Sequence, residues 1–106
     1  MDMTFQADGR HLTVFLTGEL DHHAARGLMQ RLDRCMEQNL PLHTQLDLKG
    51  LTFMDSSGIA VVLRAARRME TLGGTLAVVN IPRQAAKVLD AAGLNRRVDL
   101  TEEADR

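Results

Sequence analysis

The stretch Leu51-Thr52-Phe53-Met54-Asp55-Ser56-Ser57-Gly58-Ile59 lies at the junction of a predicted strand and a predicted helix. Apolar residues at 46, 48 and 51 precede it, and apolar residues at 59, 62, 63, 66 and 69 follow at helical spacing. Asp55, Ser56 and Ser57 are residue types that favour helix N-caps. A helix N-terminus exposes unpaired N–H groups and the positive end of the dipole, where a phosphate is stabilised. The serines are therefore either simple caps or a phosphoacceptor site.

Working outward, the flanking segments predict alternating strands and helices. Asp8-Gly9 is a tight-turn signal between two strand-like runs, which indicates an N-terminal hairpin. Asp21 should cap a helix that ends at Asn39-Leu40-Pro41, and Gly73-Gly74 should end the helix that follows Ser56. The expected strands are residues 4–6, 11–17, 42–48, 75–79 and 98–100, with a third helix between Pro82 and Gly93.

This order predicts an α/β fold: one domain with a mixed, mostly parallel β-sheet, an N-terminal hairpin and packed helices. Residues 75–79 are nearly all apolar, which predicts a strand covered on both faces. The segments 18–21 and 55–56, which carry acidic and hydroxyl side chains, each follow a strand. Because sites in such sheets gather at the carboxyl ends of strands, the two segments form one surface if their strands are neighbours.

Composition narrows the function classes. The chain has 106 residues, 44% of them hydrophobic, and a formal net charge of −1, so we expect one globular domain without electrostatic attraction to nucleic acid or membrane. It contains three Phe but no Trp or Tyr, which leaves no stacking platform for bases. A single cysteine, Cys35, together with the lack of a signal-like start or membrane-length apolar run, predicts a cytoplasmic location.

Several residues allow a structural and a functional interpretation. Ser56 as the nucleophile of a small hydrolase would need an oriented base, and no Gly-x-Ser-x-Gly elbow is present. His22-His23 does not have chelating spacing, so no metal site is expected. Asp21 is either an N-cap or an acidic contact to a partner. Gly58 either permits a turn or lets a partner approach closely. A strip of arginines at 64, 67 and 68 is expected to be a solvated face.

Two segments of the chain resemble the STAS-domain anti-sigma-factor antagonists. Phe53-Met54-Asp55-Ser56-Ser57-Gly58 is similar to the family's phosphorylation motif, and residues 16–24 (Leu-Thr-Gly-Glu-Leu-Asp-His-His-Ala) are similar to its other diagnostic segment. The run Glu19-Leu20-Asp21-His22-His23 is most similar to the sporulation branch, which antagonises anti-sigma factor F. The resemblance extends over residues 2–100, so we expect residues 1–106 to form one STAS domain.

The resemblance implies a cofactor-free, non-enzymatic partner switch in transcription regulation. The unphosphorylated form would bind an anti-sigma factor that is also a serine kinase, and so release a sigma factor. That kinase would phosphorylate Ser56, the first serine after Asp55, and a serine phosphatase would restore the protein. The implied partner-binding residues are Asp21, Asp55, Ser57, Gly58 and Ile59. The alternatives are a STAS module of another partner-switching or lipid-transport system and, more distantly, a small serine hydrolase.

Overall fold

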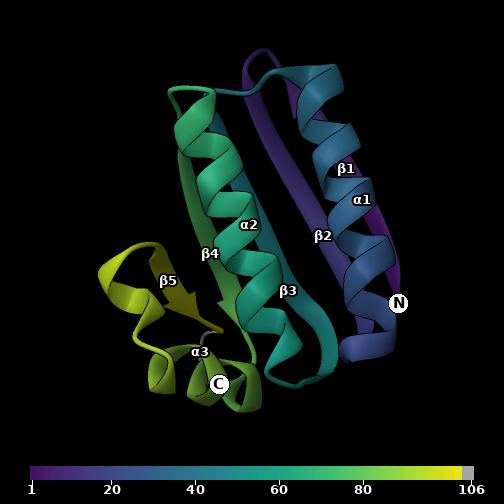
Figure 1. Cartoon of the computed structure of the whole chain (residues 1–106), viewed down its shortest axis with the longest axis vertical. Helices are drawn as coiled ribbons and strands as arrows, with labels where there is room; N and C mark the ends of the chain where they lie inside the picture. The colour runs from purple at the N-terminus through teal and green to yellow at the C-terminus, as the bar shows by residue number, and fades with distance from the viewer. Residues whose placement is uncertain (104–106) are drawn as a thin grey trace.

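Five strands form one sheet in the order β1-β2-β3-β4-β5, so strands that follow one another in sequence are also hydrogen-bonded neighbours (Figure 1). The computed structural model describes residues 1–103. The β1–β2 pair is antiparallel and the other pairs are parallel, which confirms the α/β class, the hairpin and the mostly parallel sheet. The elements are β1 (Asp2–Asp8), β2 (His11–Leu20), α1 (His22–Asn39), β3 (His43–Met54), α2 (Ser57–Thr71), β4 (Thr75–Ile81), α3 (Arg83–Ala91), the 3-10 helix η1 (Leu94–Arg96) and β5 (Asp99–Glu102).

The helices α1 and α2 lie side by side over one face of the sheet, with α3 at its lower end (Figure 1). Because each parallel strand is added on the same side of the previous one, right-handed crossovers place the connecting helices on the same face. The prediction that β4 is covered on both faces is therefore wrong. Its inward residues Leu76 and Val78 are buried, whereas Ala77 and Val79 on the other face are only half-buried.

The core lies between the sheet and the helices. On α1 the buried residues Leu28, Leu32, Cys35 and Met36 recur at three- and four-residue spacing, as the sequence predicts. On β2 the alternate residues 12, 14 and 16 meet them from the sheet. Asp21 caps α1 and Leu40 ends it in the left-handed conformation, with φ 43°. Pro82 immediately precedes α3, and Gly93 follows it with φ 73°.

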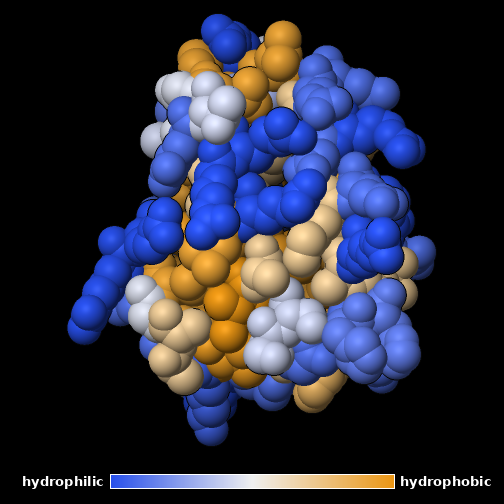
Figure 2. Space-filling model, in the orientation of Figure 1, coloured by the Kyte–Doolittle hydropathy of each residue, from blue (hydrophilic) through white to orange (hydrophobic). Residues whose placement is uncertain are grey.

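Ion pairs join α1 to α2 across the helical face. Arg64 contacts Asp33 at 2.7 Å, and Arg68 contacts Asp33 at 3.5 Å and Glu37 at 3.0 Å. The hydrogen bond from Arg64 is the largest cause that holds the pKa of Asp33 below its ordinary value. Hydrophilic side chains cross this face over the upper part of α2, and hydrophobic surface shows below them (Figure 2). The prediction of a solvated arginine strip therefore holds for Arg67, which is exposed, whereas Arg64 and Arg68 form ion pairs that connect α2 to α1.

No helix within residues 1–103 is both long and apolar enough to cross a bilayer.

Replacing Gly74 and Gly27 by alanine should change the free energy of unfolding in opposite directions. A Cβ at Gly74 would contact the Leu42 carbonyl oxygen, which accepts a hydrogen bond from Thr75 N–H, and would lie 2.7 Å from Met69 Cε. Because backbone has to move, we expect Gly74→Ala to lower the free energy of unfolding by about 1–3 kcal/mol. Gly27, inside α1, has no atom within 4 Å of such a Cβ, so Gly27→Ala should raise it by about 0.5–1 kcal/mol. Denaturant unfolding of both variants measures the difference, and equal effects would contradict the packing at Gly74.

Candidate functional site

The two polar segments singled out in the sequence lie next to each other because β2 and β3 pair along their whole length. Their register continues through Glu19↔Phe53 to Leu20↔Met54, at the carboxyl end of both strands. The sequence predicted a third strand of residues 42–48, and the structure extends it to Met54. The extension brings Asp21 and Asp55 to the same edge of the sheet. The condition for a single surface, neighbouring strands, is therefore met.

Asp55 holds this edge together. One carboxylate oxygen, Oδ2, accepts a hydrogen bond from the His22 N–H at 3.1 Å, and the other, Oδ1, accepts one from the Ser57 N–H at 2.8 Å. These N–H groups belong to the first residues of α1 and α2. The Asp55 N–H donates to the Leu20 carbonyl at 3.1 Å. One carboxylate therefore binds the N-termini of two helices, while its own backbone continues the pairing with β2.

The pKa of the Asp55 carboxyl lies below its ordinary value of 3.8. The Ser57 N–H contributes most to this decrease, and the Ser57 side chain, the His22 N–H and the His22 charge add to it, whereas partial desolvation acts in the opposite direction. A lowered pKa in the folded state means that the ionised carboxylate stabilises the fold above pH 3.8. That contribution is lost as the pH falls through the lowered value.

Ser56 is exposed and occupies the N-cap position of α2, but its side chain makes no capping hydrogen bond. Its hydroxyl has no hydrogen-bond partner among residues 1–103. Of the three residues that the sequence offered as caps of this helix, Asp55 is the one whose side chain accepts an N–H group of its first turn. The expectation of unpaired N–H groups beside Ser56 is wrong, because Gly58 N–H donates to the Asp55 carbonyl at 3.0 Å and Ile59 N–H donates to the Ser56 carbonyl at 3.1 Å.

Gly58 is buried against the protein's own interior. A Cβ there would lie 2.5 Å from Cγ and 2.6 Å from Sδ of Met54, a side chain with 0% exposure. The close approach that this glycine permits is therefore between α2 and β3, and the structure corrects the interpretation that its missing Cβ makes room for a partner. Ile59, the next residue, is half-buried and packs against the core.

Polar and aromatic side chains from the start of α1 and the end of β3 lie at this edge. Asp21 Oδ1 accepts the Ala24 N–H at 3.0 Å, so its expected capping role is confirmed. The exposed imidazoles of His22 and His23 lie 3.9 Å apart, centroid to centroid. Phe53, opposite Glu19, is 42% exposed. Phe53 was not among the predicted partner-binding residues, although its place in the motif, two residues before Asp55, was a usable signal.

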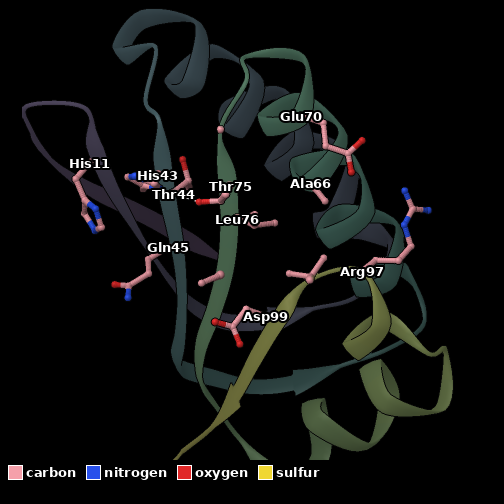
Figure 3. A pocket seen from close by; sticks show the side chains of 13 residues that line it. His11, His43, Thr44, Gln45, Ala66, Glu70, Thr75, Leu76, Arg97 and Asp99 are labelled. Carbon is pink, nitrogen blue, oxygen red and sulfur yellow. Dashed lines mark hydrogen bonds between the residues drawn. The ribbon is translucent and has the colours of Figure 1, made fainter.

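A separate hollow of about 530 Å³ lies at the opposite end of the sheet. His11, His43 and Thr75, the first residues of β2, β3 and β4, line it, and Glu70, Arg97 and Asp99 complete its polar wall (Figure 3). His43 Nδ1 lies 2.8 Å from Thr75 Oγ1. Since Ser56 follows the carboxyl end of β3, this hollow is not part of the Asp55–Ser56 edge.

The family assignment follows from comparison with known proteins. The STAS domain model matches residues 2–105. This chain belongs to the STAS family. It is 35% identical over 96 residues to an anti-sigma F factor antagonist of Paenibacillus polymyxa, which covers 87% of this chain and 82% of that protein. The resemblance seen in the two sequence segments is therefore confirmed.

Two solved structures of SpoIIAA have the same fold. The unphosphorylated anti-sigma factor antagonist SpoIIAA matches with a TM-score of 0.80 and 26% identity, over 96% of this chain and 90% of that one. The phosphorylated form of SpoIIAA from Bacillus matches with a TM-score of 0.72 and 26% identity, over 96% and 93%. The α/β architecture expected from the sequence is the STAS fold of these structures.

Removing the Asp55 carboxylate should leave an N–H group at the start of both α1 and α2 without its acceptor. Removing the Asp21 carboxylate should do so only in α1. In Asp55→Ala we expect faster amide exchange at both His22 and Ser57, because both N–H groups lose their acceptor. Asp21→Ala should accelerate amide exchange at Ala24. It should lower the free energy of unfolding by about 1 kcal/mol, the usual effect of losing an N-cap. Lowering the pH of the unaltered protein through the lowered pKa of Asp55 should reproduce the Asp55 pattern. Unchanged exchange at His22 in Asp55→Ala would contradict the shared carboxylate.

Proposed function

We propose that this protein is an anti-sigma-factor antagonist whose binding is switched off by phosphorylation of Ser56. The unmodified form binds an anti-sigma factor with serine kinase activity, and so releases the sigma factor for transcription. The kinase transfers the γ-phosphate of ATP to the Ser56 hydroxyl, and a serine phosphatase removes it. The protein acts in the cytoplasm, contributes no cofactor and performs no catalysis of its own. The family and the similarity to anti-sigma F factor antagonists support the antagonist role.

The observation that carries the phosphorylation step is the isolation of the Ser56 hydroxyl. It is exposed, it lies in the turn between β3 and α2, and it has no hydrogen-bond partner among residues 1–103. No base within residues 1–103 contacts the hydroxyl or activates it, which argues against the hydrolase alternative. A phosphoacceptor needs only exposure, because the kinase supplies base, metal and ATP.

The proposed interface is the carboxyl edge of β2 and β3. Asp21 and Asp55 provide negative charge, and Phe53 and Ile59 provide apolar surface next to Ser56. Ser57 lies beside Ser56 at the start of α2. Gly58 contributes indirectly, through the packing of α2 on Met54. A phosphoryl group adds about −1.5 to −2 charge and three acceptor oxygens, so a surface fitted to a hydroxyl would suffer repulsion and desolvation cost.

Ser56 rather than Ser57 should receive the phosphate. Ser57 is half-buried and its N–H donates to Asp55, whereas Ser56 is exposed and its hydroxyl has no partner within residues 1–103. The test incubates the purified protein with ATP and the anti-sigma F homologue from the same genome, followed by peptide mass spectrometry. Ser57→Ala should still be labelled and Ser56→Ala should not. Phosphate on Ser57, or full labelling of Ser56→Ala, would overturn the assignment.

Binding should depend on the charge at position 56. We expect Ser56→Ala to bind the unmodified anti-sigma homologue like the unaltered protein and to remain bound in the presence of ATP. Ser56→Asp should bind more weakly, but less so than the phosphorylated protein, because it carries one charge and fewer oxygens. Titration calorimetry measures the affinities. Lys87→Ala, on the exposed side of α3, is the matched control. Equal affinity of phosphorylated and unmodified protein would contradict the switch.

Phosphorylation should leave the fold and its stability nearly unchanged. The α2 dipole favours a negative group at Ser56 by about 0.3–1 kcal/mol, but the adjacent Asp55 carboxylate repels it and already accepts the Ser57 N–H. These effects oppose each other, so we expect the free energy of unfolding to change by less than about 1 kcal/mol. Thermal melts and amide exchange test this. Loss of protection throughout the domain would show that the switch acts by unfolding.

A further inference from the structure

The second half of β3 has a strand partner on only one side. Its register with β4 ends at Asp47↔Val79, whereas its register with β2 continues to Leu20↔Met54. At Met54 the unpaired side is occupied by the side chain of Gln84. The Met54 N–H donates to Gln84 Oε1 at 2.8 Å, and Gln84 Nε2 donates to the Met54 carbonyl at 2.7 Å. The carboxamide thus makes the pair of hydrogen bonds that a neighbouring strand would make.

The carboxamide of Gln84 is held in place by a helix that is packed into the core. It lies in the first turn of α3, directly after Pro82 and Arg83, and α3 is anchored in the core through Ala85, Ala86 and Leu89. Asn and Gln carry a carboxamide, whose donor and acceptor lie on one planar group as they do in a peptide. A carboxylate of the same size can accept from the Met54 N–H but cannot donate to its carbonyl. The pairing is therefore specific to the glutamine, not to a side chain of its length.

Met54 is the residue before Asp55, so this pairing acts on the site edge. The main chain of Met54 is held by Gln84, and the next peptide is held by Leu20 through the Asp55 N–H. With both peptides fixed, the Asp55 carboxylate lies within hydrogen-bond distance of His22 and Ser57. Loosening Met54 would allow the turn that carries Ser56 to rotate away from both helix starts.

We propose that Gln84 is a positioning residue for Ser56, which connects α3 to the turn that presents the phosphoacceptor. The naming of Ser56 as phosphoacceptor rests on the proposed function, whereas the mechanical connection rests on the geometry alone. Gln84 is 30 residues away from Met54 in the sequence and belongs to neither of the two segments that resemble the family. Gln84 therefore gives α3 a direct hydrogen-bonded connection to the turn that carries Ser56.

The connection can be tested without any partner. In Gln84→Ala we expect the Met54 amide to exchange about tenfold faster, the effect of losing hydrogen bonds of ordinary strength, with smaller increases at His22 and Ser57. The carboxyl pKa of Asp55, followed by carbon NMR, should rise towards its ordinary value of 3.8. Gln84→Glu should restore only part of the protection of the Met54 amide, since Glu keeps the acceptor but cannot donate to the Met54 carbonyl. Lys87→Ala, an exposed residue of the same helix, should change none of these.

The outcomes separate a positioning role from a general structural one. Exchange at Val14 and Leu46, in the buried centres of β2 and β3, should stay at the unaltered rate in every variant. Uniform acceleration that includes these two residues would overturn the proposal, as would normal exchange at His22 and Ser57 in Gln84→Ala.

A second arm measures phosphorylation of Ser56 by the anti-sigma homologue from the same genome. Gln84→Ala should lower kcat more than it raises KM, and Gln84→Glu should recover part of the loss. Wild-type kinetics in Gln84→Ala would overturn the role in presenting Ser56. If the unaltered protein is not phosphorylated at all, the proposed function fails, and the exchange experiment still decides the role of Gln84.

Discussion

The site edge depends on one carboxylate that binds two helix N-termini. Asp55 accepts the first N–H group of α1 and the first N–H group of α2, so the helices start from a common anion. A helix start carries partial positive charge, and two of them in proximity would repel each other without such a group between them. The segments 19–23 and 53–58 therefore form one structural unit. A pair of motifs separated by some thirty residues is what this geometry requires of the sequence.

The strand order makes that arrangement possible. Because β2, β3 and β4 are added in sequence and all run parallel, the strand-to-helix turns after β2 and β3 open at the same edge of the sheet, where α1 and α2 begin. The same order places the helices on one face and leaves Ala77 and Val79 half-buried on the other. The functional edge and the open sheet face are thus two consequences of one topology.

Local patterns in the sequence predicted most of the elements, because turns, caps and apolar periodicity act over a few residues. The Asp8-Gly9 hairpin, the Asp21 cap and the buried stripe of α1 were all visible in this way. Contacts between distant residues were not. The extension of β3 to Met54 comes from pairing with β2, and the Arg64–Asp33 pair joins residues 31 apart in the chain.

At the site, the roles that depend on local sequence patterns were predicted, and those that depend on contacts with other elements were not. Asp55 and Ser56 stood out because acidic and hydroxyl side chains at a strand–helix junction form a local pattern. That Asp55, rather than Ser57, caps α2 depends on how the turn orients its carboxylate towards α1 as well. The burial of Gly58 depends on the Met54 side chain below it. Gln84 gave no signal, because one glutamine in a helix is ordinary until its partner backbone is known.

The hydrogen bonding around Ser56 divides the turn into fixed and free groups. The backbone of Met54, both oxygens of Asp55, and the N–H groups of Ser57, Gly58 and Ile59 are all engaged in internal hydrogen bonds. The Ser56 hydroxyl, on an exposed residue of the same turn, has no partner within residues 1–103. A chemical change at a group with no internal partner alters the surface without removing an interaction that holds the fold. A site built in this way can carry a regulatory charge because the surrounding network, and not the modified residue, maintains its shape.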